Sequence, residues 1–154
     1  MATATGFYDV ADKLKEILLG DENVNTVTYG DITKVATNKT TIYPLSHFTV
    51  NSVQIQDHTF LFNITLACMD VIDQTNDSTT DAFNGNDNQM DIFNTQLSVV
   101  SRAMLLLRRS ATSDAGYKLV GQPTTSQFNH RFEDDVAGWD VTFDVVIVQD
   151  NNVC

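Results

Sequence analysis

The chain has 154 residues, of which 42% are hydrophobic, and this is enough for one compact domain with a core under a single sheet. Twenty acidic side chains against nine basic ones give a formal net charge of −11. This charge argues against sequence-independent binding to DNA or to an anionic membrane, because both need a positive surface. A negative surface would instead suit a passage along which a polyanion slides without adhering.

The sequence carries no signal for secretion or membrane insertion. Residues 1–6 lack the basic and apolar regions of a secretory signal, and aliphatic runs such as Val145–Val148 are too short to span a bilayer. We therefore expect a soluble protein that is made in the cytoplasm and does not bind membranes. Cys68 falls on the apolar side of a predicted strand and Cys154 is the last residue, so a disulfide between them is not expected.

The first predicted element is an amphipathic helix. Phe7–Leu19 places its apolar side chains on one face and is followed by Gly20, a residue that commonly ends helices. The next segment is rich in Thr, Asn and Gly, and we expect a short strand near Val24–Tyr29. An extended, partly irregular connection should follow it.

Two long strands are predicted to form an antiparallel hairpin. Pro44 disfavours a central strand and marks residues 42–45 as an edge or entry segment, which leads into a strand over Phe48–Gln56. The second strand is expected over Phe60–Val71. The apolar parity of the first strand changes at Asn51-Ser52, which predicts either a β-bulge or a switch of face between the core and a partner surface.

A second, longer helix is the clearest signal in the chain. It is expected over Met90–Arg109, after a polar stretch, Thr75–Asn88, that predicts a long mobile loop. A charge introduced at Leu97 or Val100 should unfold the protein, because the apolar side chains of this helix are expected to pack on a sheet. These side chains recur at spacings of three and four: Met90, Phe93, Leu97, Val100, Met104 and Leu107.

The remaining chain is predicted to add three strands. These are Tyr117–Val120, Gln127–Glu133 and, after a turn over Asp134–Gly138, Trp139–Gln149. The pattern indicates an α+β fold for residues 1–154, taken as one domain. A mostly antiparallel sheet should pack against the long helix and the N-terminal helix.

No pattern predicts catalysis, so we expect a protein that is not an enzyme and uses no cofactor or metal. A nucleophile set beside a histidine and an orienting acid is not found. The histidines at positions 47, 58 and 130 lack the spacing of zinc ligands, and His130 is expected to be structural. Residues 81–87 depart from the calcium-loop motif. Trp139 is interpreted as a core or sheet-end aromatic residue, with a binding platform as the less favoured alternative.

Two features leave a choice between a role within the chain and a contact with another subunit. Arg108 and Arg109 are expected to neutralise the negative end of the second helix, or to meet acidic groups on a neighbouring copy. Val146 and Val148 in the last strand, and Leu61 in an earlier one, are apolar on the face opposite the expected core. Either the first helix or a neighbouring copy should cover them.

The order of these elements resembles that of tail terminator and related head–tail joining, or neck, proteins of tailed bacteriophages. The resemblance covers most of the chain and is one of layout rather than of a sharp motif. It rests on Phe7–Leu19, on the Phe48–Val71 hairpin with its Tyr43-Pro44-Leu45 entry, on Met90–Arg109, and on the turn from Phe132 to Trp139 that leads into Asp140–Gln149.

The resemblance implies a structural virion protein made in the bacterial host cytoplasm and located in the tail or neck. Its subunits would form a ring, expected to be a hexamer, that caps the tail tube and meets tail-tube and neck or connector proteins. Genomic DNA would only pass through the channel. Loop 75–88 would become ordered on assembly. Together with the residues singled out above, the candidate interface residues are Asp77, Asp81, Phe83, Asp87, Arg108, Arg109, Val146 and Val148.

Two alternatives remain open at this point. A tail-tube or connector protein would share the small size, the acidic charge and the polar loops, but would form tubes or another junction. A small ligand- or carbohydrate-binding module would also combine strands with polar loops, but would remain a monomer and bind a small molecule. An enzyme of an unrecognised kind is the least favoured reading.

Overall fold

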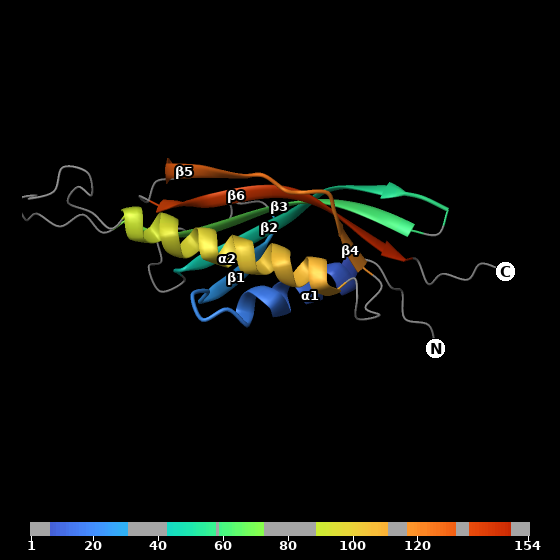
Figure 1. Cartoon of the computed structure of the whole chain (residues 1–154), viewed down its shortest axis with the longest axis horizontal. Coiled ribbons are helices and arrows are strands. Elements are labelled where there is room, and N and C mark those ends of the chain that lie inside the picture. The colour runs from blue at the N-terminus through green and yellow to red at the C-terminus, as the bar shows by residue number, and fades with distance from the viewer. Residues whose placement is uncertain are drawn as a thin grey trace, which may run out of the picture.

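A computed structural model describes residues 7–30, 43–57, 59–72, 89–110, 117–131 and 136–148. The described chain forms one sheet with both helices on the same face (Figure 1). This arrangement confirms the predicted α+β class. The elements are α1 (Phe7–Leu19), β1 (Thr26–Tyr29), β2 (Leu45–Ile55), β3 (Thr59–Val71), α2 (Gln89–Ser110), β4 (Tyr117–Val120), β5 (Thr125–Arg131) and β6 (Val136–Val148).

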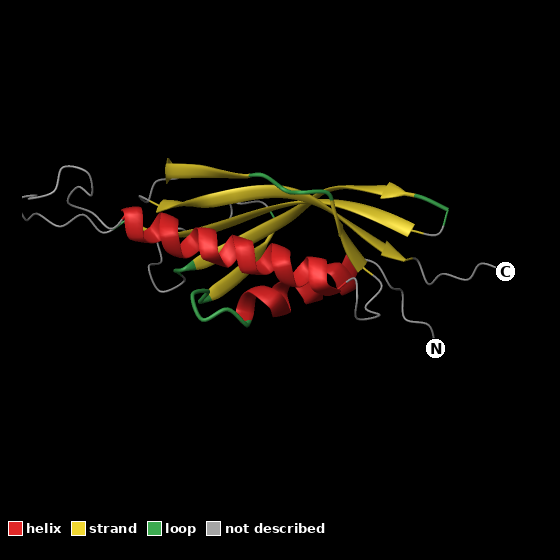
Figure 2. Ribbon diagram, in the orientation of Figure 1, coloured by secondary structure: helices red, strands yellow, loops and turns green. Residues whose placement is uncertain are grey.

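The sheet has the strand order β1-β2-β3-β6, and both β4 and β5 pair with β6 (Figure 2). All pairs are antiparallel except β1 with β2, which is parallel. β4 pairs with residues 144–147 of β6 and β5 pairs with residues 136–141. The two short strands therefore follow one another along the same edge of β6.

The β2–β3 hairpin contains the predicted bulge. Val50 pairs with Ile64 and Ser52 pairs with Asn63, so Asn51 is an extra residue in β2. Beyond the bulge, Val53 pairs with Phe62, which lies in the core cluster beneath the helices. Val53 and Ile55 thus stay on the helix-covered side, and the alternative of a switch to a partner-facing side is wrong.

The predicted bounds of β2, β5 and β6 need correction. β2 begins at Leu45, immediately after Pro44, because Leu45 pairs with Thr26 on one side and Met69 on the other. β5 covers residues 125–131 rather than 127–133. β6 begins at Val136, so Gly138 lies inside a strand and not in a turn.

Both helices form where they were predicted, but the buried face of α2 differs from the expected one. Met90 and Leu97 are 43% and 39% exposed, so their assignment to the core is wrong. Val100 and Leu107 are buried as expected, while Phe93 and Met104 are half-buried. Compared with the predicted face, the buried face includes a polar side chain, Gln96, and a small one, Ala103. Its buried residues are Ile92, Gln96, Val99, Val100, Ala103 and Leu107.

The face of the sheet away from the helices has a small core of its own at one end. Met69 and Val136 are fully buried there, although residues of the same parity farther along the strands are exposed or half-buried. This end is also where β5 pairs with β6. The cluster consists of Tyr43, Leu45, Ala67, Met69, Phe128 and Val136.

Candidate functional site

The most exposed apolar surface lies on the β2–β3 hairpin, which reaches beyond the last turn of α2 (Figure 1). Residues 51–55 of β2 are all exposed. Val53 is 39% exposed and Ile55 is 77% exposed, although both lie on the side of the sheet that carries the helices. They are exposed because neither helix extends far enough to cover them. We call Val53 and Ile55, with the half-buried Phe60 that pairs with Ile55, the hairpin patch.

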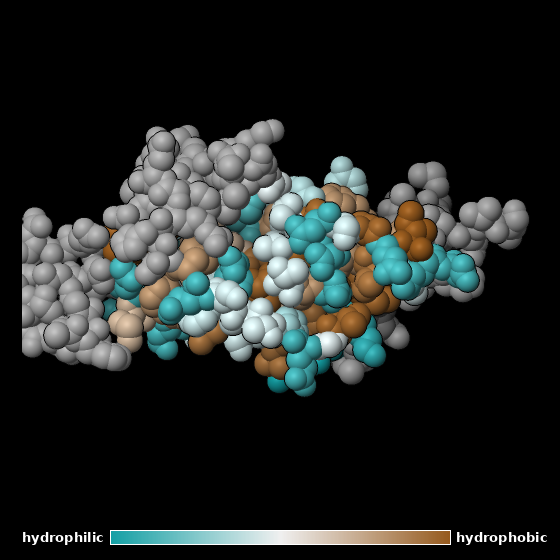
Figure 3. Space-filling view, turned by 90° about the horizontal axis from the view of Figure 1, so that it is seen from above, coloured by the Kyte–Doolittle hydropathy of each residue, from teal (hydrophilic) through white to brown (hydrophobic). Residues whose placement is uncertain are grey.

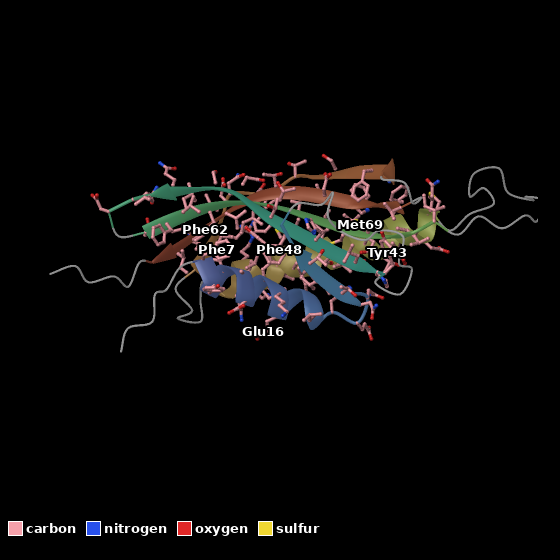
Figure 4. All side chains as sticks on the ribbon, turned by 180° about the vertical axis from the view of Figure 1, so that it is seen from behind. Phe7, Glu16, Tyr43, Phe48, Phe62 and Met69 are labelled. Atoms are coloured by element: carbon pink, nitrogen blue, oxygen red, sulfur yellow. The ribbon has the colours of Figure 1, made fainter. Side chains whose placement is uncertain are left out.

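Aromatic side chains extend from the core to the surface where α1 begins. Phe48 is buried and its ring centroid lies 5.2 Å from that of Tyr29, which lies 5.6 Å from Phe7. Phe7 in turn lies 6.0 Å from Tyr8, and all three pairs meet edge to face. Figure 4 shows Phe7 and Phe48 on the α1 side of the sheet. Phe7, Tyr8 and Tyr29 are each more than 40% exposed.

The opposite face of the sheet carries a polar ladder across three strands. Asn51 Nδ2 donates to Asn63 Oδ1 at 2.9 Å and to Thr65 Oγ1 at 2.7 Å. Asn63 Nδ2 donates to Asp144 Oδ1 at 2.8 Å, and the hydroxyls of Thr65 and Thr142 lie 3.1 Å apart. The bulge residue Asn51 therefore connects β2 to β3, and the ladder continues to β6.

Leu61 and Val146 lie next to this ladder. They face each other across β3 and β6 and are both half-buried. The prediction that α1 covers them within the chain is wrong, because α1 packs into the core on the other face. Coverage by a neighbouring copy is the remaining alternative. Figure 3 shows hydrophobic side chains gathered toward the hairpin end of the face seen from above.

A groove of about 620 Å³ separates α1 from α2 on the outer surface of the helix layer. Its floor is apolar and includes Ile17, Val99 and Leu106. One wall carries an ion pair, in which Arg102 donates from Nε and Nη2 to the two carboxylate oxygens of Asp21 at 2.7 and 2.9 Å. This bidentate pair joins α2 to the turn that follows α1.

The Asp21–Arg102 pair makes stability depend on pH. Hydrogen bonding to Arg102 holds the pKa of the Asp21 carboxyl below its ordinary value of 3.8, despite the opposing effect of burial. A carboxyl with a lowered folded-state pKa stabilises the fold above its unfolded pKa, and this contribution is lost as the pH falls through the folded value. The Arg102 side chain is 47% exposed, so solvent screening keeps the effect modest.

We expect Asp21→Asn to lower the free energy of unfolding by about 1 kcal/mol at pH 7. The difference from wild type should shrink as the pH falls below the ordinary pKa of 3.8 and through the lower pKa of the folded state, because the wild-type carboxyl then becomes protonated. Urea denaturation followed by circular dichroism at several pH values measures it. Asp12→Asn, at an exposed position of α1, is the matched control and should leave the free energy of unfolding at pH 7 unchanged.

Several predicted residues have structural partners within the chain. Trp139 Nε1 donates to the Phe93 carbonyl at 2.8 Å and its ring meets Phe93 edge to face, so Trp139 packs against α2 as expected. His47 is buried, with Nε2 donating to the Gly30 carbonyl at 2.8 Å and Nδ1 2.7 Å from the Thr28 hydroxyl. These contacts tie β2 to β1.

Cys68 is also buried, and burial raises the pKa of its thiol to about 12. Its thiol therefore stays protonated in the folded chain at neutral pH. Ser46 donates a hydrogen bond to Cys68 Sγ at 3.5 Å. This contact connects two buried side chains of β2 and β3.

The other predicted interface residues are placed only in part. Arg108 Nη2 donates to the Gly121 carbonyl at 2.7 Å, so it joins the end of α2 to the β4–β5 connection. Arg109 is exposed in the same turn. The loop 75–88, with Asp77, Asp81, Phe83 and Asp87, lies outside the described residues, as do the side chains of Val148 and His130.

Within the described ranges, no three His, Cys, Asp or Glu side chains gather in a way that could hold a metal ion. Neither α1 nor α2 combines the length and apolar character needed to cross a membrane. No protein-family model and no curated protein sequence matches this chain. The fold is thus the property that the structure establishes.

Two features of these surfaces were not predicted from the sequence. Asp21 and Arg102 are 81 residues apart, and nothing in their local sequence singles out this pair. The sequence predicts a helix at Tyr8 and a strand at Tyr29 but not that both rings are exposed. For Tyr8, an aromatic residue on the polar side of an amphipathic helix could have indicated this exposure. The sequence predicts the hairpin patch in part, because the apolar parity changes at residue 51 and thereby singles out Val53 and Ile55.

Proposed function

We propose that this chain is a structural virion protein, a tail terminator whose subunits form a ring that caps the tail tube and joins it to the head or neck. The observation that carries the proposal is the hairpin patch. Contiguous exposed apolar side chains on a projecting element favour burial against another protein chain. The resemblance in element order supplies the particular role, and the exposed hairpin supports self-association.

The hairpin patch and the Leu61–Val146 surface lie on opposite faces of the same end of the sheet. A subunit with two different contact surfaces can associate head to tail, and such an interface closes into a ring when the rotation between neighbours permits it. The net charge of −11 suits a channel through which DNA passes. Tail-tube and neck proteins would contact the two ends of the ring.

The test is negative-stain electron microscopy with native mass spectrometry over a wide concentration range. We expect closed rings with six times the 17.1 kDa subunit mass. Long tubes would instead support the tail-tube alternative. Monomers at every concentration would contradict the proposal.

A variant of the hairpin patch sharpens this test. Ile55→Asp should prevent ring formation while leaving the circular dichroism spectrum unchanged, because this side chain is 77% exposed. Gln54→Asp introduces the same charge at the adjacent exposed position, which points to the other face of the sheet. This control should still form rings. Equal loss of rings in both variants would show that added charge, and not the patch, is responsible.

A small-ligand-binding module is the second candidate, and the groove between α1 and α2 favours it. Its volume of about 620 Å³ falls within the range of small-molecule sites. Ligand binding predicts a monomer whose thermal unfolding temperature rises saturably with a sugar or another small polar molecule. The ring proposal predicts no such shift.

A further inference from the structure

β2 has an unpaired edge where the hairpin projects from the fold. β1 pairs only with Leu45–Phe48 of β2 and ends well before the hairpin turn (Figure 1). Among the described residues, no strand pairs with Thr49–Ile55 on the side away from β3. We call Thr49–Ile55 the open edge of β2. It is long enough to seat a typical strand of about five or six residues.

The main-chain groups of Val53 and Ile55 point outward from this edge. The Gln56 amide donates to the Thr59 carbonyl at 2.9 Å, so the main-chain groups of Gln56 face β3. Successive residues of a strand direct these groups to opposite sides. Those of Gln54 therefore also face β3, whereas those of Val53 and Ile55 face away from it. An incoming strand would meet the N–H and C=O groups of these two residues.

The open edge is held in shape by the strands behind it. β3 lies between β2 and β6 as far as the hairpin turn, where Phe60 pairs with both Ile55 and Ile147. At the bulge, Asn51 Nδ2 donates to Asn63 Oδ1 on β3 at 2.9 Å. A strand that binds here meets an edge that is already ordered, which lowers the entropy cost of binding.

The sequence of the open edge does little to prevent pairing. Natural edge strands are commonly protected by lysine, other charges or proline, but the sequence from Thr49 to Gln56 contains none of these. The bulge at Asn51 is a protective feature of another kind, yet it leaves Ser52–Ile55 in regular register with β3. The opposite edge of the sheet is divided between β4 and β5, with Pro123 between them. The contrast indicates that β2 carries the binding edge.

The charge of the chain favours a second copy at this edge. Two copies with a net charge of −11 repel each other, and the repulsion is weakest where a surface carries no charge. The open edge is such a surface. An added strand would also run beside the exposed apolar side chains of Val53 and Ile55 on the helix side and beside the exposed Gln54 on the other. A segment with alternating apolar and polar residues fits both sides.

We propose that the open edge of β2 binds an extended segment of a second copy of this chain, which adds a strand to the sheet. Main-chain hydrogen bonds to Val53 and Ile55 supply affinity, and the hairpin patch beside them supplies apolar contacts. Each subunit of the ring then receives a strand from one neighbour and gives a different segment to the next. The inference rests on the proposed function, since it names how neighbouring subunits hold each other.

Val53→Pro tests the main-chain contact. The substitution removes the outward N–H of Val53 and leaves the pairing of Gln54 with β3 in place, because proline is tolerated in edge strands where the N–H faces solvent. Val53→Ala is the matched control, since it shortens the same side chain but keeps the N–H. Sedimentation velocity measures the self-association of each variant, and circular dichroism establishes that each is folded.

We expect Val53→Pro to associate at least tenfold more weakly than wild type, because a hydrogen bond is lost and the proline ring obstructs the incoming strand. Val53→Ala should weaken association less than threefold. Hydrogen exchange of the wild-type chain gives a second readout that needs no variant. Mass spectrometry with electron-transfer fragmentation should show the Val53 and Ile55 amides exchanging at least tenfold more slowly in rings than in dissociated subunits.

Three results would overturn the inference. Equal weakening by Val53→Ala would assign the effect to the side chain rather than to the main chain. Slow exchange of the Val53 and Ile55 amides in dissociated subunits would show that the edge is occupied within the chain. Rings in which these two amides exchange as fast as in dissociated subunits would reject strand addition and leave the proposed function in place.

The opposite combination separates the inference from the ring. A closed dimer of twice the 17.1 kDa subunit mass, which Val53→Pro prevents and Val53→Ala does not, would support strand addition by a second copy and reject the ring. Monomers at every concentration would reject both.

Discussion

Replacing Val100 by aspartate is expected to unfold the subunit. Val100 is only 3% exposed on the face of α2 that packs against the sheet. A carboxylate forced into this core has no partner and loses its hydration, so the free energy of unfolding should fall by about 4 kcal/mol or more. Urea denaturation followed by circular dichroism measures the loss.

Leu97→Asp provides the control within the same helix. The sequence pattern places Leu97 beside Val100 in the core, but this side chain is 39% exposed. We therefore expect the variant to fold and to lose no more than about 1 kcal/mol. Equal unfolding of both variants would show that the buried face of α2 has been assigned incorrectly.

Gly138→Ala should be the most disruptive single-methyl substitution in the sheet. A Cβ atom at this position would overlap the Cys68 carbonyl oxygen and lie 2.8 Å from Met69 Cα. These are backbone atoms of the paired strand β3, so the strands must separate locally to admit the methyl group. We expect a loss of about 3 kcal/mol, measured by thermal or urea unfolding.

Gly121→Ala separates this packing effect from the general cost of replacing glycine. Gly121 has a φ of 72°, and a Cβ atom added there would meet nothing within 4 Å. Alanine at this position is strained by the left-handed backbone alone, which costs about 1 kcal/mol. A loss at Gly138 no larger than that at Gly121 would argue against close contact between β3 and β6.

Local sequence signals predicted the helices and the central hairpin well. α1 spans the residues expected from its apolar spacing and from Gly20, and the bulge at Asn51 lies where the parity changes. Both signals depend on neighbours within a few residues. The same is true of the bounds of α2, which differ from the prediction by a single residue at each end.

The buried face of α2 could not be predicted in the same way. Hydrophobicity favours Met90 and Leu97, whereas the structure buries Gln96 and Ala103. Which sector of the helix is covered depends on where α1 and the sheet lie, and these contacts join distant parts of the chain. Both polar atoms of the Gln96 amide are buried without a hydrogen-bond partner among the described residues, a placement that a scan for apolar side chains does not select.

The residues proposed for an interface differ in the same way in how far the sequence predicts them. Arg108 and Arg109 were identified from the charge order of the helix, which is local, and they lie at an exposed corner. The contact between the end of α2 and the end of β4 follows only from the structure, through the Arg108–Gly121 hydrogen bond. A contact that spans two elements is not visible in either segment alone.

The division of one sheet edge between β4 and β5 limits how far the sheet can grow. A long, regular edge can act as a template for further strands and lead to aggregation. Here residues 121–124, including Pro123, separate a strand of four residues from one of seven. Proline cannot donate a backbone hydrogen bond, so an incoming strand finds no continuous ladder along this side. We therefore expect this edge to be a poor template for fibre formation.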